Sequence, residues 1–501
     1  MYQSFIGLEV HIHLLTKTKV FCPCRAAFGD EPNLNVCPVC MGYPGTIPVL
    51  NIEAMRMGAI VARALNCSIP EKTWFDRKHY FYPDISKNYQ ISQLGSPIGK
   101  NGYLDIEGKI GDKEIKKRVK IKQCHLEEDA GKMIHTGTVS FLDYNRAGSS
   151  LLEIVTEPCL ETGEEAELFI QQLRRMVRYL GVCDGNMEEG SLRADANISI
   201  NLPGKGLGQR VEVKNLNSSR FIKLAISYEI ARHSALFDAG KPIAQETRLW
   251  NENRDETFPM REKENANDYR YFQDPDLPVF CLDAGFLKSV DDAMVELPLQ
   301  RVKRITGEYG LNSEQADLIC EEKALADYFE AAASAAGEAS AAAGAEGLSK
   351  KDAAVRIANW LLHDIKHILS RDGIELHDIA SFRVSPARLA GLVVMAGAGK
   401  ITGKNAKQCL EAVIKEDKDP AQIVKERGWE IITDPAQIAQ ALKAVAESEA
   451  DVIGELKGAD INEKRRQTLT AFLVGKVLAA TGGRADPKVA GNLVNELISG
   501  K

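Results

Sequence analysis

The sequence predicts an α+β protein in which a mainly antiparallel-sheet domain is followed by an all-α region. Up to about residue 290, short segments alternate apolar and polar residues, which is typical of strands with one buried face. Only two long helical patterns interrupt them, whereas from residue 294 onward Ala, Leu, Lys and Glu recur at helical spacing. Because 501 residues exceed what one hydrophobic core supports, we expect several domains.

We expect the sheet domain over residues 1–293, as a cradle that carries the active site. Its first strand is GLEVHIHL (7–14), in which aliphatic residues alternate with Glu9, His11 and His13. Two helices interrupt the strands, at 164–181 and 219–240, and each ends on a Gly in C-cap position. Further strands are expected at KKRVKIKQCHLEED, SLRADANISI and QRVEVKNLN.

The all-α region divides into two predicted modules, a helical domain over 294–405 and a helical tail domain over 406–501. Amphipathic helices joined by Gly, Pro and Asp turns fill both of them. The Ala-rich stretch 332–347 is of low complexity, and we expect a mobile loop or a frayed helix there, without chemistry.

The bulk composition, 44% hydrophobic and 27% charged, is that of a globular protein. There is no apolar run of the roughly 18 residues that a membrane helix needs, nor a signal-peptide pattern. We therefore expect a cytoplasmic protein without a membrane partner. A net charge of −7 argues against a broadly basic nucleic-acid-binding protein but leaves room for a local basic face.

The strongest single motif is a set of four cysteines. Cys22-Pro-Cys24 and Cys37-Pro-Val-Cys40 are separated by twelve residues, which is the spacing of metal ligands. Thiolates suit tetrahedral zinc, and a site closed by four of them would be structural. A redox-active pair or chance clustering is the alternative. A disulfide framework is disfavoured, because the chain carries no secretion signal.

Carboxylates recur on the polar faces of several predicted strands. Glu9 lies in the first strand, Glu127 and Glu128 end another, and Asp195 shares a strand face with Arg193. Carboxylates gathered on one surface repel each other unless a divalent cation neutralises them, and hard oxygen ligands favour magnesium beside a phosphate. For any single strand a solvated face is the alternative. The recurrence on several strands favours a cation and phosphate site.

The segment DRKHYFYPDISKNYQISQ (76–93) interleaves three aromatic residues with cations, among them Arg77 and Lys78. This mixture suits stacking on a base together with phosphate contacts, although aromatic clusters more often belong to a core.

Several motifs, in order, resemble the B subunit of the tRNA-dependent amidotransferases. They cover residues 5 to about 280 and read IGLEVHIHL, CPVCMGYPGTIPVLN, DRKHYFYPD, HLEEDAGK, DYNRAGSSLLEIVTEP, EEGSLRADANIS, RVEVKNLNS and NDYRYF. The last third is similar to the helical and tail modules of that family. The match departs at Ser86, Ser219 and Gln273, where the family usually has proline, an aromatic residue and proline.

The resemblance implies an enzyme that uses ATP to phosphorylate the side-chain carboxylate of mischarged Glu-tRNA(Gln) or Asp-tRNA(Asn). Ammonia from a separate amidase-fold glutaminase subunit then displaces the phosphate, and a small third subunit completes the heterotrimer. The implied cofactors are ATP, Mg²⁺ and a structural Zn²⁺ at Cys22, Cys24, Cys37 and Cys40.

The same resemblance implies roles for the polar residues of the sheet. Glu9, His11, Glu127, Glu128 and Asp195 would be catalytic residues that hold magnesium. Lys78 and Arg77 would contact the nucleotide phosphates, and the helical tail domain would bind the tRNA. A tRNA-binding scaffold without ATP chemistry and a free-standing ATP-dependent ligase are the competing hypotheses.

Overall fold

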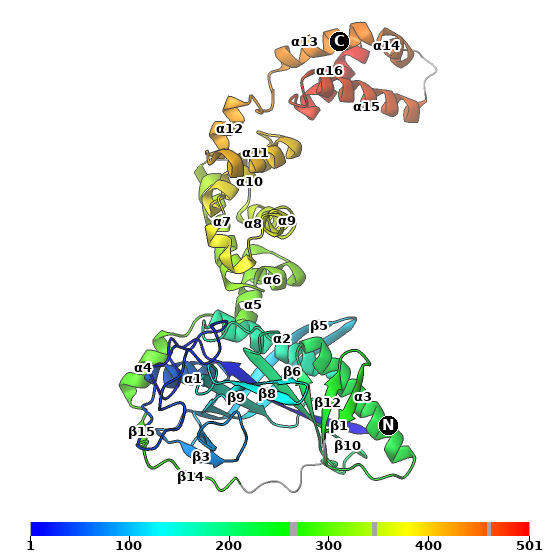
Figure 1. Cartoon of the computed structure of the whole chain (residues 1–501). Coiled ribbons are helices and arrows are strands. Elements are labelled where there is room, and N and C mark those ends of the chain that lie inside the picture. The colour runs from blue at the N-terminus through cyan, green and yellow to red at the C-terminus, as the bar shows by residue number, and fades with distance from the viewer. Residues whose placement is uncertain (1, 261–268, 343–347, 458–461, 500–501) are drawn as a thin grey trace. The chain divides into compact units, whose positions relative to one another are not determined.

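The computed structural model describes residues 2–260, 269–342, 348–457 and 462–499 (Figure 1). The chain forms two compact units, Met1–Gln300 and Arg301–Lys501. Residues 267 and 268 of the NDYRYF motif and residues 343–347 of the Ala-rich stretch lie outside the described residues. Among the described helices, none is both long and apolar enough to cross a bilayer.

An eleven-stranded sheet forms the centre of the first unit. Its order is β13-β12-β11-β10-β1-β9-β6-β4-β3-β14, with β5 paired to β6, and its pairs are antiparallel except β11 with β12. The strands are β1 (Gln3–His13), β3 (Asp76–His79), β4 (Tyr89–Ser92), β5 (Gly99–Ile110), β6 (Lys113–Glu128), β9 (Ser150–Thr156), β10 (Leu192–Asn201), β11 (Val211–Leu216), β12 (Thr247–Asn251), β13 (Glu256–Pro259) and β14 (Phe272–Gln273).

Among the described residues, two smaller sheets and four helices complete the unit. Strands β2 (Lys72–Thr73) and β15 (Phe280–Cys281) form one pair, and β7 (Lys132–Thr136) with β8 (Val139–Asp143) forms a hairpin. The helices are α1 (Ile52–Ala64), α2 (Gly163–Tyr179), α3 (Ser219–Asp238) and α4 (Ala284–Asp292).

The apolar face of the central sheet packs against helices. Leu8, Val10 and Ile12 of β1 are fully buried in a core that α1, α2 and α3 share. Because side chains alternate along a strand, this burial places Glu9, His11 and His13 on the opposite face. The alternation predicted for residues 7–14 and for Leu192–Asn201 is confirmed.

Both helices predicted in this unit are present. Thr162 and Ser218 cap the N-termini of α2 and α3 by accepting hydrogen bonds from Glu165 N and Phe221 N. Each helix stops before a Gly with positive φ, at +66° for Gly181 and +64° for Gly240, where only Gly is unstrained.

The second unit is all-helical, as predicted. Its elements are α5 (Pro298–Tyr309), α6 (Ser313–Ile319), α7 (Lys323–Ala342), α8 (Lys350–Asn359), η2 (Trp360–Ile365), α9 (Lys366–Arg371), η3 (Leu376–Ser381), α10 (Pro386–Gly397), α11 (Gly403–Glu416), α12 (Pro420–Glu426), α13 (Pro435–Ser448), α14 (Ala450–Lys457), α15 (Glu463–Ala480) and α16 (Pro487–Ser499). One apolar core spans Val302 to Val424 and a second spans Ile438 to Val494. The first of these cores extends past the boundary predicted at residue 405.

The Ala-rich stretch corrects one expectation. Where it is described, it is the C-terminal half of α7, with Ala332, Ala333 and Ala336 fully buried. Alanine has the highest helix propensity and its small side chain lets helices approach closely, so the described part of this stretch, up to Ala342, is a packed helix rather than a loop.

Candidate active site

The polar face of the central sheet gathers the predicted residues by strand register. On β1, His11 lies opposite Arg193 of β10 on one side and Glu153 of β9 on the other. Glu153 in turn lies opposite His125 of β6. Glu9 lies opposite Asp195. Four neighbouring strands therefore present ionisable side chains close to one another.

His11, Glu127 and Glu153 form the tightest group. One ligand atom from each lies within 4.8 Å of the other two. His11 Nε2 is 3.6 Å from Oε1 of Glu127 and 3.6 Å from Oε2 of Glu153. His125 Nε2 is 2.9 Å from the same Glu153 oxygen. An imidazole and two carboxylates at this spacing form a donor set that a divalent cation can fill.

The pKa values in this group follow from burial and from mutual charge. Burial raises the pKa of Glu127, and the neighbouring Glu153 raises it further, against the opposing effect of His11. Burial alone would lower the pKa of His11, but Glu153 and Glu127 outweigh it and raise that pKa. Two buried carboxylates held close together are costly without positive charge between them, and a bound cation would remove that cost.

Glu9 and Asp195 flank this group, and both contact protein donors. Glu9 Oε1 accepts a hydrogen bond from Asn197 Nδ2 at 3.0 Å, and burial raises the pKa of Glu9. Asp195 Oδ2 lies 2.6 Å from Lys214 Nζ. Burial would lower the pKa of Lys214, but Asp195 and Glu212 raise it above its ordinary value. The two carboxylates thus lie on the polar face without joining the three-residue group.

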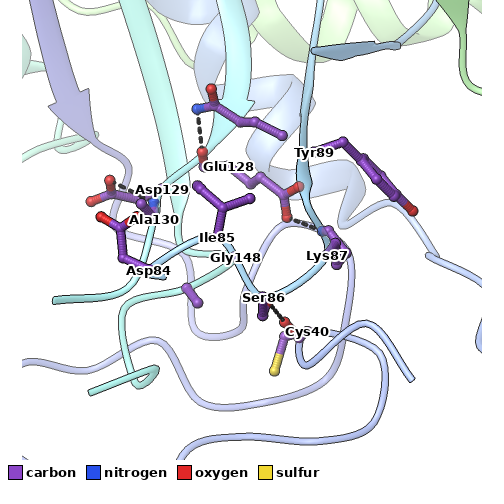
Figure 2. Close-up of a pocket in the computed structure, with 12 residues that line it drawn as sticks. Cys40, Asp84, Ile85, Ser86, Lys87, Tyr89, Glu128, Asp129, Ala130 and Gly148 are labelled. Atoms are coloured by element: carbon purple, nitrogen blue, oxygen red, sulfur yellow. Dashed lines mark hydrogen bonds and ion pairs between the residues drawn. The ribbon is translucent and has the colours of Figure 1, made fainter. Parts of the chain in front are cut away.

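The side chain of Glu128 points away from the group formed by His11, Glu127 and Glu153. Its carboxylate lies 2.5 Å from Lys87 Nζ and accepts the backbone N–H of Ile91 at 2.8 Å. Figure 2 shows this pair at the wall of a pocket that Asp129, Ser86 and Cys40 also line. Because consecutive strand residues face opposite ways, Glu127 and Glu128 cannot both reach the same group. Both oxygens of Glu128 already have protein partners.

The two predicted nucleotide contacts differ in their surroundings. Arg77 is paired with Asp274 at 2.8 Å and with Asp276 at 2.8 Å, so its charge is balanced within the protein. Lys78 Nζ lies 5.0 Å from the ring of Tyr269, and among the described residues it has no carboxylate partner. Its charge lowers the pKa of Glu127, which places it near the three-residue group. Of the two predicted contacts, Lys78 is therefore the better suited to meet an anion.

The four predicted zinc ligands converge. The Sγ atoms of four cysteines all lie within 4.8 Å of one another, namely those of Cys22, Cys24, Cys37 and Cys40. A hydrogen bond from Cys22 lowers the pKa of Cys40 to about 4, and burial raises the pKa of Cys24 to about 11. The backbone N–H of Cys37 lies 3.2 Å from Cys40 Sγ. Four convergent thiols with one already favoured as thiolate fit a tetrahedral metal.

The chain is similar in sequence to known proteins over nearly its whole length. Residues 4–288 match the family model of the GatB/GatE catalytic domain, and residues 345–498 match that of the GatB domain. The chain is 41% identical to the B subunit of the aspartyl/glutamyl-tRNA(Asn/Gln) amidotransferase of Crocosphaera subtropica over 511 residues, covering 100% of this chain and 98% of that protein. The B subunit of the Carboxydothermus hydrogenoformans amidotransferase is 40% identical over 504 residues, covering 99% of each.

The chain belongs to this family of amidotransferase B subunits. The resemblance read from the motifs is thereby confirmed, and so is the α+β class with its all-helical C-terminal region.

Two members of the site were missed by sequence reasoning. Glu153 lies in SLLEIVT, where Leu151, Leu152 and Ile154 are buried, so the segment reads as a core strand. His125 precedes Glu127 by two residues and shares its strand face. A lone carboxylate within an apolar strand was the available signal, because burying it is costly without a partner. Of the five predicted magnesium residues, the structure brings His11 and Glu127 together with Glu153, and the magnesium role of all five stays a prediction.

Proposed function

We propose that this chain is the phosphorylating and amide-forming subunit of a tRNA-dependent amidotransferase. It would use ATP to activate the side-chain carboxylate of Glu-tRNA(Gln), Asp-tRNA(Asn) or both. The observation that carries the proposal is the convergence of His11, Glu127 and Glu153 on the polar sheet face of a chain from this family.

The proposed chemistry proceeds in two transfers. An oxygen of the substrate carboxylate attacks the γ-phosphorus of ATP, the bond from that phosphorus to the β-phosphate oxygen breaks, and ADP leaves. Ammonia then attacks the carbonyl carbon of the acyl phosphate, and the carbon–oxygen bond to phosphate breaks. Inorganic phosphate departs, and the nitrogen loses a proton to give the amide. Activation is required because an ionised carboxylate resists nucleophiles.

The chain contributes positioning and charge, which are the main requirements of phosphoryl transfer. His11, Glu127 and Glu153 would hold Mg²⁺, with Glu9 and Asp195 beside it. When bound, that ion supplies charge neutralisation for the phosphate oxygens. Lys78 would contact a phosphate oxygen, since among the described residues it has no carboxylate partner. Arg77 would act by holding Asp274 and the neighbouring aromatic rings.

The four cysteines would hold a structural Zn²⁺. Its effect would be to fix the loop between β1 and α1 against the site. Ser86 donates a hydrogen bond from its hydroxyl to the Cys40 carbonyl at 2.6 Å, and the next residue, Lys87, pairs with Glu128. The cysteine cluster is thereby tied to the strand that ends in Glu127 and Glu128.

We infer the partners from the family. An amidase-fold glutaminase subunit would supply ammonia, and a small third subunit would complete a cytoplasmic heterotrimer. Mischarged tRNA would be held in part by the C-terminal tail.

The deciding experiment is phosphate release from ATP by the chain assembled with its glutaminase partner, with and without Glu-tRNA(Gln). Release that requires charged tRNA supports the proposal. Release independent of tRNA would favour a free-standing ligase, and tRNA binding without release would favour a scaffold.

A further inference from the structure

Two arginines converge on one buried carboxylate beside His11, Glu127 and Glu153. These three residues are called the cation group below, because they are the proposed magnesium ligands. Oδ2 of Asp129 lies 3.1 Å from Nη2 of Arg193 and 3.2 Å from Nε of Arg146. The same oxygen lies 2.7 Å from Nε2 of His13. Asp129 is buried, whereas each arginine side chain keeps 37% of its surface exposed. One carboxylate thus anchors two guanidinium groups that still face the open side of the sheet.

The two arginines carry more N–H donors than the described protein groups use. Arg146 also donates to the carbonyls of Ala130 at 3.1 Å and Gly131 at 2.8 Å, which fixes its plane. Within the described part of the chain, no acceptor contacts Nη1 of either arginine, and Nε of Arg193 has no partner. Each guanidinium group is thus held on one side and keeps unused N–H donors on a side chain that is 37% exposed. Planar guanidinium donors of this kind bind carboxylates and phosphates.

The pair of Arg146 and Arg193 adjoins the His11, Glu127 and Glu153 group. Arg193 is the register partner of His11 across β10 and β1, and neighbouring strands lie about 4.8 Å apart. Asp129 follows Glu127 by two residues. A candidate cation site and two guanidinium groups with unused donors therefore lie side by side. A phosphoryl group in transfer has both requirements, because its oxygens are stabilised by a metal ion and by guanidinium donors together.

We propose that Arg146 and Arg193 form a subsite for the phosphoryl group that is transferred, with Asp129 as the positioning residue that holds both guanidinium groups. This inference rests on the proposed function, in that the phosphoryl group comes from a nucleoside triphosphate bound beside the cation group. A backbone phosphate of RNA is the competing occupant. Arg146 is fixed by backbone carbonyls and so presents a rigid donor, which suits one small anion.

The first test titrates inorganic phosphate into the full-length chain with Mg²⁺ present, followed by ³¹P line broadening. Arg193→Gln and Arg146→Gln should each raise the dissociation constant for phosphate about tenfold or more, as expected for a lost charge-assisted contact. The matched control is Arg118→Gln, because Arg118 pairs with the single carboxylate of Asp105 at 2.7 Å on the β5–β6 ribbon. It should leave phosphate affinity unchanged.

Two further variants keep the test decisive if removal of a guanidinium impairs folding. Arg193→Lys keeps the positive charge but loses the planar guanidinium donors, so phosphate should bind several-fold more weakly. The melting temperature of this variant should equal that of the wild type. Asp129→Asn should weaken phosphate binding through both arginines while the KM for tRNA stays unchanged. Wild-type affinity in these variants, or no saturable phosphate binding by the wild-type chain, would overturn the subsite.

A second arm separates this inference from the proposed function. If the wild-type assembly shows no tRNA-dependent ATP cleavage and phosphate binding still requires both arginines, the proposed function fails and the subsite stands. If the wild type cleaves ATP and both glutamine variants keep its kcat and its KM for ATP, the subsite fails and the function stands. A raised KM for tRNA alone would assign the arginines to the RNA backbone and overturn the subsite.

Discussion

Nε2 of His11 and Oε2 of Glu153 lie 3.6 Å apart across the register pair that joins β1 to β9. The same Glu153 oxygen lies 2.9 Å from Nε2 of His125, on the strand that flanks β9 on its other side. Burial would raise the pKa of Glu153, but its contacts with the two histidines outweigh burial and hold that pKa well below its ordinary value. Glu153 is thus an ionised carboxylate that connects three strands.

Replacement of Glu153 by glutamine should abolish most of the tRNA-dependent ATP cleavage. The amide keeps the shape of the side chain but carries no charge to hold a cation, and loss of one such charged contact costs roughly 100-fold or more in rate. Phosphate release by the assembled enzyme, measured across a Mg²⁺ titration, checks this. Glu161→Gln is the matched control, because that side chain is 57% exposed and lies just beyond β9. Wild-type turnover in Glu153→Gln would remove Glu153 from the cation site.

Asp195→Ala should likewise abolish tRNA-dependent ATP cleavage while leaving glutamine hydrolysis by the partner subunit largely intact. Asp195 is the only carboxylate that β10 contributes to the described polar face, and its Oδ2 lies 2.6 Å from Nζ of Lys214. The assay compares phosphate release and glutaminase activity in the same preparation. Asp105→Ala, in an exposed ion pair with Arg118, should change neither. Equal loss of both activities would indicate damage to the assembly instead of to the site.

The fold could be predicted from the sequence to the extent that its signals are local. The alternation in residues 7–14 gives one buried and one polar strand face directly, and Gly181 and Gly240 mark helix ends by their own conformational freedom. The predicted division of the helical region at residue 405 stays a prediction, because no comparable local signal marks it. Which helices share a core depends on contacts between segments that are distant in sequence. The Ala-rich half of α7, for example, is buried because other helices of the same core pack on it.

The site was predictable only in part for the same reason. His11 and Glu127 stand out because each interrupts a pattern within its own strand. Glu153 joins them only through the register of β9 with β1 and β6, which no local pattern encodes. Glu128 is adjacent to Glu127 in sequence, but strand alternation directs its side chain to Lys87, so its predicted role cannot be read from adjacency.

Metal analysis of the purified chain should give about one zinc per chain, as expected for a site closed by four thiolates. Cys37→Ser should lose that metal and lower the melting temperature of the chain by about 5 °C or more, because binding energy at a structural site is folding energy. Cys281→Ser is the control, since Cys281 is an exposed thiol that does not belong to the four-cysteine cluster. A metal-free wild-type chain with unchanged melting temperature would refute the zinc site.

A buried ionic network on α3 should make the first unit sensitive to acid. Glu229 is fully buried and contacts Arg232 at 2.7 Å, His233 at 3.2 Å, Arg248 at 3.2 Å and Thr257 at 2.5 Å. Burial would raise the pKa of Glu229, but the hydrogen bonds from His233, Arg232 and Thr257 lower it from 4.5 to about 2. That lowering corresponds to roughly 3 kcal/mol of unfolding free energy.

Because the folded pKa lies below the unfolded one, this contribution is fully present above about pH 5 and is lost as the pH falls from about 4.5 towards 2. Glu229→Gln should therefore destabilise the first unit at pH 7 and show a smaller difference from wild type at pH 3. Urea unfolding followed by near-ultraviolet circular dichroism at both pH values checks this. Glu252→Gln, at an exposed position on the loop after β12, should match the wild type at each pH. A wild-type to Glu229→Gln difference that stays constant between pH 7 and pH 3 would mean that the network stabilises α3 without depending on the Glu229 charge.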